Sequence, residues 1–117
     1  MADVVHGARE IGRGALISTH ANAERIAPTS VGKIPIFSKH FYYALGISLA
    51  NGWEFQNPFI DGYTGVSAYL KAQDISVGIV ITQLPQSASN GVGNASILLT
   101  RLSEYISPAH KIEIPGL

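Results

Sequence analysis

The 117-residue sequence contains no cysteine, so disulfides, thiolate nucleophiles and cysteine-ligated zinc are excluded. Charged residues are also scarce, at 14% of the chain, and eight basic residues balance eight acidic ones. Because binding to a nucleic-acid backbone draws its affinity from a basic field, nucleic acid is not an expected partner. The length and the 46% apolar content predict one compact domain over residues 1–117.

Long apolar runs are missing as well. A membrane-spanning helix needs about 20 consecutive apolar residues, and every run in this sequence is much shorter. The first residues, Met1 to His6, lack the basic and apolar stretches of a secretory signal. As written, the sequence predicts a cytoplasmic chain with no membrane span.

Helical spacing of apolar residues occurs near both ends of the sequence. Within residues 3–27, one short helix is expected to end at a Gly-Arg-Gly stop. A second follows Ser18 or Thr19 as its N-cap and ends before Pro28, which prevents continuation. A third helix is expected at residues 93–106, where apolar residues recur every three or four positions.

Residues 41–83 are rich in aromatic and β-branched residues, which favour strands. The four expected strands are residues 41–49, 53–56, 63–70 and 75–83. Asn51-Gly52 is a strong signal for a hairpin turn, and the short connections predict antiparallel neighbours. Trp53 and Phe55 are interpreted as core residues. The predicted class is α+β: an antiparallel β-meander of about four strands packed in two layers against N-terminal and C-terminal helices.

Short motifs follow one another in order along most of the chain. They are Gly14-Ala15-Leu16-Ile17-Ser18, Tyr43-Ala44-Leu45-Gly46, the Asn51-Gly52 turn, Gly62-Tyr63-Thr64-Gly65, Ser67 to Leu70, Val77 to Gln83 and the helix around Leu98. This order resembles the carboxy-terminal part of the serine β-lactamase-like hydrolases, which include penicillin-binding DD-peptidases and related esterases. Such proteins often carry Tyr-Gly-Leu-Gly on a strand, a hairpin, His-Thr-Gly or Lys-Thr-Gly on the next strand, and a closing helix.

The resemblance implies a substrate-binding strand. Thr64 matches the threonine whose hydroxyl holds a substrate carboxylate or carbonyl, and Gly65 matches the glycine beside which the substrate lies. The N–H of Val66 would be half of an oxyanion hole, a donor that acts because it is fixed before charge develops. Tyr63 replaces the usual His or Lys and supplies no fixed cation. The implied partner is a small acyl substrate or a peptide, and no cofactor is implied.

The family's nucleophile has only a weak counterpart in these residues. Family catalysis uses Ser-x-x-Lys at a helix start, with Tyr-x-Asn or Ser-x-Asn for proton transfer. The sequence has neither of the latter motifs. Ser30-Val31-Gly32-Lys33 matches the first, yet Gly32 and the nearby Pro28 and Pro35 oppose a helical turn there. Ser30 and Lys33 are therefore predicted to lie in a surface loop.

The histidines give no metal site, because none are spaced as ligands on one helix face. Three hypotheses for function remain. The first is the carboxy-terminal portion of a β-lactamase-like hydrolase, inactive alone, from a family often exported. The second is a small non-catalytic binding or assembly module that oligomerises through an open sheet edge. The third is an independent enzyme that uses Ser30 and Lys33 or a His–carboxylate pair such as His20 and Glu24.

Overall fold

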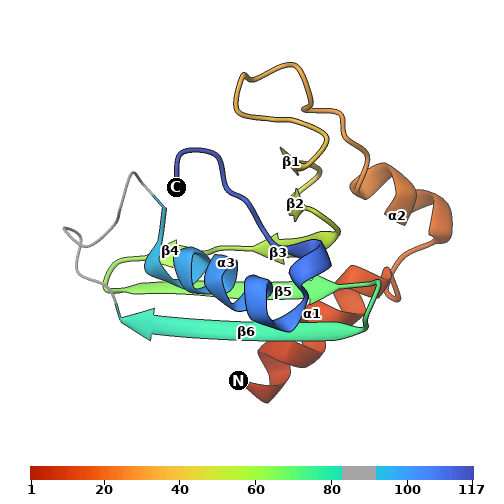
Figure 1. The fold of residues 1–117 in the computed structure, drawn as a ribbon. Coiled ribbons are helices and arrows are strands. Elements are labelled where there is room, and N and C mark those ends of the chain that lie inside the picture. The colour runs from red at the N-terminus through yellow and green to blue at the C-terminus, as the bar shows by residue number, and fades with distance from the viewer. Residues whose placement is uncertain (83–91) are drawn as a thin grey trace.

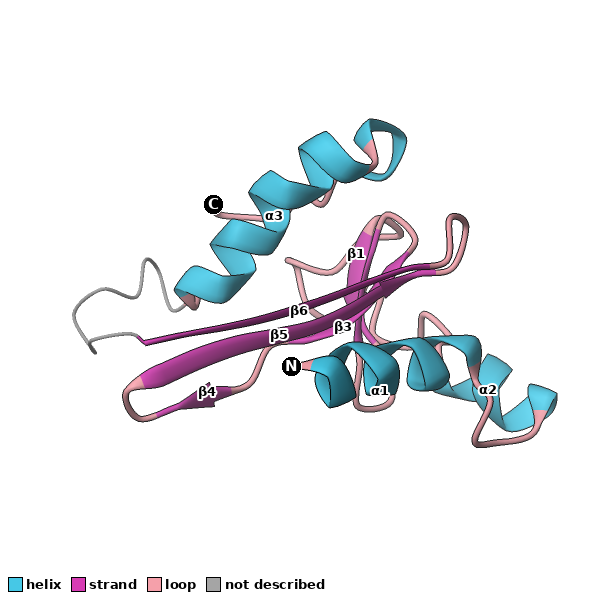
Figure 2. Cartoon of the chain, turned by 90° about the horizontal axis from the view of Figure 1, so that it is seen from below, coloured by secondary structure: helices cyan, strands magenta, loops and turns pink. Residues whose placement is uncertain are grey.

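A single antiparallel sheet forms the middle of the structure, with helices on both of its faces (Figures 1 and 2). The computed structural model describes residues 1–82 and 92–117. The helices are α1 (Ala2–Arg13), α2 (Thr19–Arg25) and α3 (Asn94–Ile106), with a 3₁₀ turn η2 (Pro108–His110). The strands are β1 (Phe41–Tyr43), β2 (Ser48–Ala50), β3 (Trp53–Gln56), β4 (Phe59–Ile60), β5 (Tyr63–Leu70) and β6 (Ile75–Thr82).

β5 is the central strand of this sheet. Along one side it pairs with β6 over its whole length, from Tyr63 opposite Thr82 to Leu70 opposite Ile75. Along the other side it pairs with β3 and then with β4, and β2 and β1 continue the sheet beyond β3. The predicted α+β class with antiparallel neighbours is confirmed. Gln83, the last residue of the fourth predicted strand, lies outside the described residues.

The predicted single strand over residues 41–49 is wrong. This segment folds back on itself as the β1–β2 hairpin, in which Tyr43 is opposite Ser48. The turn closes with a hydrogen bond from Ala44 N–H to the Ile47 carbonyl at 2.8 Å. Gly46 sits at φ 71° in the left-handed region, where glycine has no steric penalty. A run of strand-forming residues therefore contains its own turn.

The main core lies between the sheet and α3. Trp53 and Phe55 are buried there, which confirms their interpretation as core residues. The buried cluster comprises Ala50, Trp53, Phe55, Val66, Ala68, Leu70, Ile79, Ala95, Leu99 and Ile112. The C-terminal tail closes this layer: Ser103 Oγ accepts from Ile112 N–H at 2.8 Å, and Trp53 Nε1 donates to the His110 carbonyl at 2.8 Å.

α1 covers the opposite face of the sheet, as the edge-on view of Figure 2 shows. Gly12 lies against Tyr69 of β5, and Val4 and Val5 lie over Gly78 of β6. The prediction of two layers is therefore wrong, because α1 and α3 pack on opposite faces and make three. Periodicity identifies an apolar helix stripe but not the sheet face that it covers. None of the helices in the described ranges has the length and apolar character needed to cross a membrane.

Candidate functional site

The residues expected to bind substrate begin β5, and the structure places their side chains on two different faces. Thr64 is 2% exposed and points toward the start of α3, where its Oγ1 would lie 2.2 Å from a Cβ built on Gly93. Tyr63 is 53% exposed on the other face. The sequence motif is thus a local strand segment and does not gather the two side chains into one pocket.

The backbone of this segment is enclosed by neighbouring strands. Gly65 N–H donates to the Pro58 carbonyl at 3.0 Å, on the β4 side. Because successive residues of a strand alternate in direction, Val66 N–H points to β6, where Val66 is opposite Ile79. A substrate lying along β5 would have to displace β4 or β6. The substrate and oxyanion roles of Tyr63, Thr64, Gly65 and Val66 remain predictions.

Ser30 and Lys33 lie in a turn, as predicted. Ser30 Oγ donates to the Tyr43 carbonyl, and Lys33 N–H donates to the Ser30 carbonyl at 3.1 Å. Gly32, between them, has φ 78°, which is incompatible with a right-handed helical turn. Within the described residues, the Lys33 amine has no ion pair or hydrogen bond. The Lys33 amine is therefore not hydrogen-bonded to Ser30, whose hydroxyl instead donates to a backbone carbonyl.

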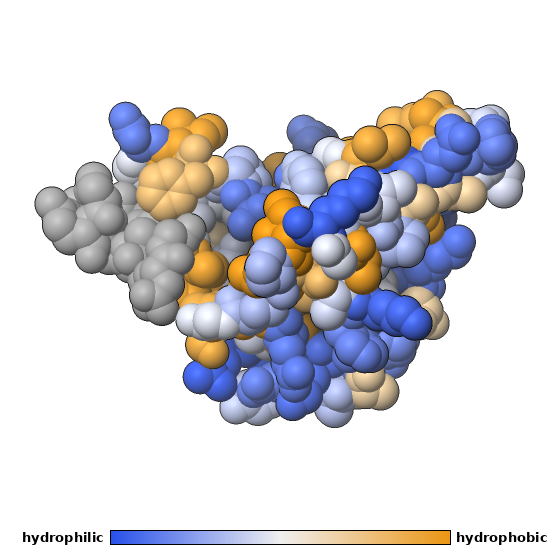
Figure 3. All heavy atoms as spheres, turned by 90° about the horizontal axis from the view of Figure 1, so that it is seen from above, coloured by the Kyte–Doolittle hydropathy of each residue, from blue (hydrophilic) through white to orange (hydrophobic). Residues whose placement is uncertain are grey.

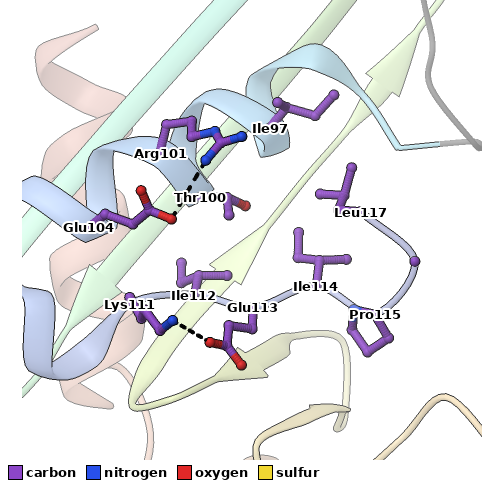
Figure 4. Close-up of a pocket in the computed structure, with 11 residues that line it drawn as sticks. Ile97, Thr100, Arg101, Glu104, Lys111, Ile112, Glu113, Ile114, Pro115 and Leu117 are labelled. Carbon is purple, nitrogen blue, oxygen red and sulfur yellow. Dashed lines mark ion pairs between the residues drawn. The ribbon is translucent and has the colours of Figure 1, made fainter.

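A groove of about 520 Å³ lies between α3 and the C-terminal tail (Figure 4). Its rim carries two ion pairs, Arg101 with Glu104 at 3.8 Å and Lys111 with Glu113 at 2.6 Å. The hydrogen bond from Lys111 lowers the pKa of the Glu113 carboxyl. A carboxylate held ionised beside its own cation is a poor general acid. The groove therefore has apolar residues at its floor and charged side chains at its rim that pair with one another, and the ionised Glu113 is not suited to donate a proton.

Asp74, in the turn between β5 and β6, is the centre of a polar cluster that the sequence did not reveal. Its carboxylate accepts hydrogen bonds from Arg9, from Arg13 at 2.9 Å and from the Tyr69 hydroxyl at 2.9 Å. The bond from Arg9, followed by that from Tyr69, lowers the pKa of Asp74. The available signal was the four-residue spacing of Arg9 and Arg13, which places both on one face of α1. The cluster fastens α1 to the sheet.

A second ion pair fastens α2. Arg25 and Glu54 meet at 2.8 Å, and both side chains are mostly buried. Burial raises the pKa of Glu54 despite the opposing effect of Arg25. Burial also raises the pKa of the nearby Tyr42, whose hydroxyl donates to the Ile26 carbonyl at 2.9 Å. These groups are occupied in joining α2 and the residue that follows it to β1 and β3. In the part of the chain that the structure describes, no group of three or more metal-binding side chains is close enough to hold an ion.

β6 forms an open edge of the sheet. Since Ile79 faces Val66 of β5, the alternate residues Ser76, Gly78, Val80 and Thr82 direct their backbone N–H and C=O groups away from the sheet. Within residues 1–82 and 92–117, these outward groups have no hydrogen-bond partner. We call these four residues the β6 edge. No residue of the eight-residue strand is charged or proline.

Helices border the β6 edge on both faces. On one face, Met1 and Val5 of α1 approach Gly78, and a hollow of about 490 Å³ lies between α1, Asp74 and Ser76. On the other face, the tail packs along one flank of α3, because Ile97 and Thr100 line the groove shared with it. At 100° per residue, Leu98 and Tyr105 lie on the opposite flank, toward β6. Both side chains are exposed.

Apolar residues are also exposed away from β6. On the face seen in Figure 3, they form several separate patches, among them one at the connection between α1 and α2 and one over β4. Leu16 and Ile60 are the most exposed apolar residues at these two places. β4 is also an edge strand, but it has only two residues, against eight in β6. Comparisons with protein-family models, curated proteins and solved structures found no match.

Proposed function

We propose that this chain is a binding module that acts by accepting a β-strand at the β6 edge, and that it does not catalyse a reaction on its own. The observation that carries the proposal is the row of unpartnered backbone groups at Ser76, Gly78, Val80 and Thr82, within the described residues. An added strand would pair with these groups and extend the sheet, which is a recurrent mode of peptide recognition.

The chemistry of β6 favours strand addition. Proteins usually protect an open edge with charges, proline or a bulge, because an unprotected edge pairs with other chains. β6 has no charge and no proline, and its pairing with β5 is regular over all eight residues. Leu98 and Tyr105 on one face and Val5 on the other would contact side chains of the added strand. Backbone pairing then supplies affinity and these side chains supply preference.

We further propose that the module derives from the serine β-lactamase-like hydrolases. The order of motifs from Gly14 to the helix around Leu98 supports this descent. The placement of Ser30, whose hydroxyl is engaged by the Tyr43 carbonyl, supports the absence of hydrolysis by these residues. The fold would then serve recognition in place of catalysis.

The test is a selection of eight-residue peptides that bind the full chain. Binding should slow amide hydrogen exchange at Gly78 and Val80, and Val80→Pro should abolish it by removing one outward N–H. Proline is tolerated where the missing N–H faces solvent on an edge strand. Leu45→Lys, at another exposed apolar residue, in the β1–β2 turn, is the control and should leave binding unchanged. Peptide binding that leaves these amides unprotected, or that survives Val80→Pro, contradicts the proposal.

A further inference from the structure

The sequence of β6 is close to a palindrome in residue type. Reading outward from Ile79, the flanking pairs are Gly78 and Val80, then Val77 and Ile81, then Ser76 and Thr82. Val77 and Ile81 are both β-branched, and Ser76 and Thr82 both carry a hydroxyl, whereas Gly78 and Val80 differ in size. We propose that the strand accepted by the β6 edge is β6 of a second copy, antiparallel about a two-fold axis at Ile79. This inference rests on the proposed function.

The register follows from which residues face outward. Backbone pairing requires outward residues of one copy to face outward residues of the other, so the axis must pass through a residue and not between two. An axis at Ile79 pairs Ser76 with the partner's Thr82 and Gly78 with the partner's Val80, so that the whole β6 edge is used. An axis at Gly78 would set Thr82 against Asp74 in the turn. An axis at Val80 would set Ser76 opposite residue 84, outside the described residues, and would leave fewer pairs within β6.

The outermost pair of this register joins two hydroxyl residues. Ser76 Oγ is enclosed by its own chain and has no hydrogen-bond partner in the described structure, as is also true of Ser96 Oγ and Ser107 Oγ, so that atom is not itself the contact with the second copy. At the β6 edge, the partner's Thr82 would lie directly opposite Ser76 on the same face. Cross-strand Ser and Thr pairs of this kind stabilise antiparallel sheets.

The neighbouring pair is complementary in shape. Val80 is 55% exposed, whereas Gly78 has no side chain and lies beneath Met1 and Val5 of α1. Pairing Gly78 with the partner's Val80 therefore brings an exposed apolar side chain beside the apolar start of α1. On the other face, Val77 would be opposite the partner's Ile81, which is a favourable β-branched pair.

The borders of the edge are also suited to a second copy. A two-fold axis perpendicular to the sheet puts both α3 helices on one face, so that Leu98 and Tyr105 of each copy turn toward the other. Tyr105 is 85% exposed and Leu98 is also exposed in the single chain. Because β6 has no charge, its self-pairing brings no like charges together. Such an isologous contact closes at a dimer.

The absence of cysteine makes the register testable by disulfide trapping in the full chain. Directly opposite, hydrogen-bonded residues have Cα atoms about 5.5 Å apart, within the range that a disulfide spans. A mixture of Ser76→Cys and Thr82→Cys chains should give a covalent dimer, and each variant alone should give much less. Val80→Cys alone is the matched control, because it self-links only if the axis passes through residue 80. Preferential linking of that control overturns the proposed register.

Analytical ultracentrifugation separates this inference from the proposed function. The wild-type chain should dimerise, and Val80→Pro should weaken the dimer roughly tenfold or more, because each two-fold contact contains two Val80–Gly78 pairs and loses one N–H donor from each. The same variant should leave the monomer folded, since the missing N–H faces solvent on an edge strand. A chain that stays monomeric while selected peptides still protect Gly78 and Val80 overturns the second copy as occupant and leaves the proposed function standing. A monomer without peptide protection overturns both.

Discussion

Gly12 of α1 lies directly against Tyr69 of β5. A Cβ built on Gly12 would come 2.1 Å from Cδ1 and 2.8 Å from Cβ of Tyr69, so no rotation of the ring could make room for it. The Tyr69 hydroxyl in turn donates to Asp74, which also binds Arg9 and Arg13 of the same helix. One contact thus sets the distance of α1 from the sheet, and the polar cluster sets its position along β6.

Two glycines of α1 provide a matched test of this contact. Gly12→Ala should lower the free energy of unfolding by about 1–3 kcal/mol, because the added methyl forces α1 away from Tyr69. Gly7→Ala gains the same helix propensity but meets no atom within 4 Å. It should therefore raise the free energy of unfolding by about 0.5–1 kcal/mol. Urea unfolding measures both, and equal effects of the two substitutions would show that the contact is not limiting.

Asp74→Asn should remove an acid-sensitive component of stability. The hydrogen bonds from Arg9 and Tyr69 lower the pKa of Asp74 in the folded chain, so the folded state binds its proton more weakly than the unfolded state. The stabilisation is present above the unfolded pKa of about 3.9 and is lost as the pH falls through the lower folded value. Urea unfolding at a series of pH values from 7 to 2.5 measures it.

In the wild type, the urea midpoint should fall as this carboxyl is protonated, and the Asp74→Asn variant should be less stable at pH 7 with a flatter dependence below pH 4. Glu113→Gln is the comparison variant. The pKa of Glu113 is also lowered, by Lys111 in the tail, so this variant should leave in place the acid dependence that comes from Asp74. If Asp74→Asn kept the full acid dependence of the wild type, Asp74 would not be its source.

Trp53→Phe should detach the C-terminal tail from the sheet. Trp53 is fully buried, and its indole N–H donates to the His110 carbonyl at 2.8 Å. The variant loses that hydrogen bond and some packing, so the free energy of unfolding should fall by about 1–3 kcal/mol. Hydrogen exchange should also rise at the Ile112 amide. Tyr105→Phe, at an exposed aromatic residue, should stay within about 0.5 kcal/mol of the wild type.

Local patterns in the sequence identified the parts of the fold that depend on local forces. Ser18 caps α2 by accepting from Ala21 N–H at 3.1 Å, and the stretches that form β5, β6 and α3 have clear periodicity. The β1–β2 hairpin was missed because Gly46 interrupts a run of strand formers without the usual two-residue turn signal. The two-residue strand β4 is too short for any periodicity, and only its pairing with β5 defines it.

The candidate site was harder to predict because it depends on which strand has no neighbour. An open sheet edge was one of the hypotheses, yet the pattern of β6 is that of any buried strand, and only the pairing of β5 shows which side of β6 is free. For the same reason, the motif at Thr64 gives no sign that its side chain is buried against Gly93. Alternation places a side chain on one of two faces, and tertiary packing decides which face is covered.

The last prediction concerns acylation, which separates a binding module from a hydrolase. After exposure to a penicillin or to an activated aryl ester, the intact mass of the folded chain should be unchanged. A serine nucleophile needs a base within hydrogen-bond reach, whereas Ser30 Oγ donates to a carbonyl and Lys33 is unpaired among the described residues.

Circular dichroism of the same sample establishes that the chain is folded, and Ser30→Ala is the matched control. A stoichiometric adduct that maps to Ser30 and is lost in Ser30→Ala would contradict the non-catalytic assignment. It would mean that the turn around Gly32 rearranges when substrate binds, so that Lys33 reaches the serine. An unmodified chain that still binds strands at Gly78 and Val80 separates recognition from chemistry, because the β6 edge then works without a nucleophile.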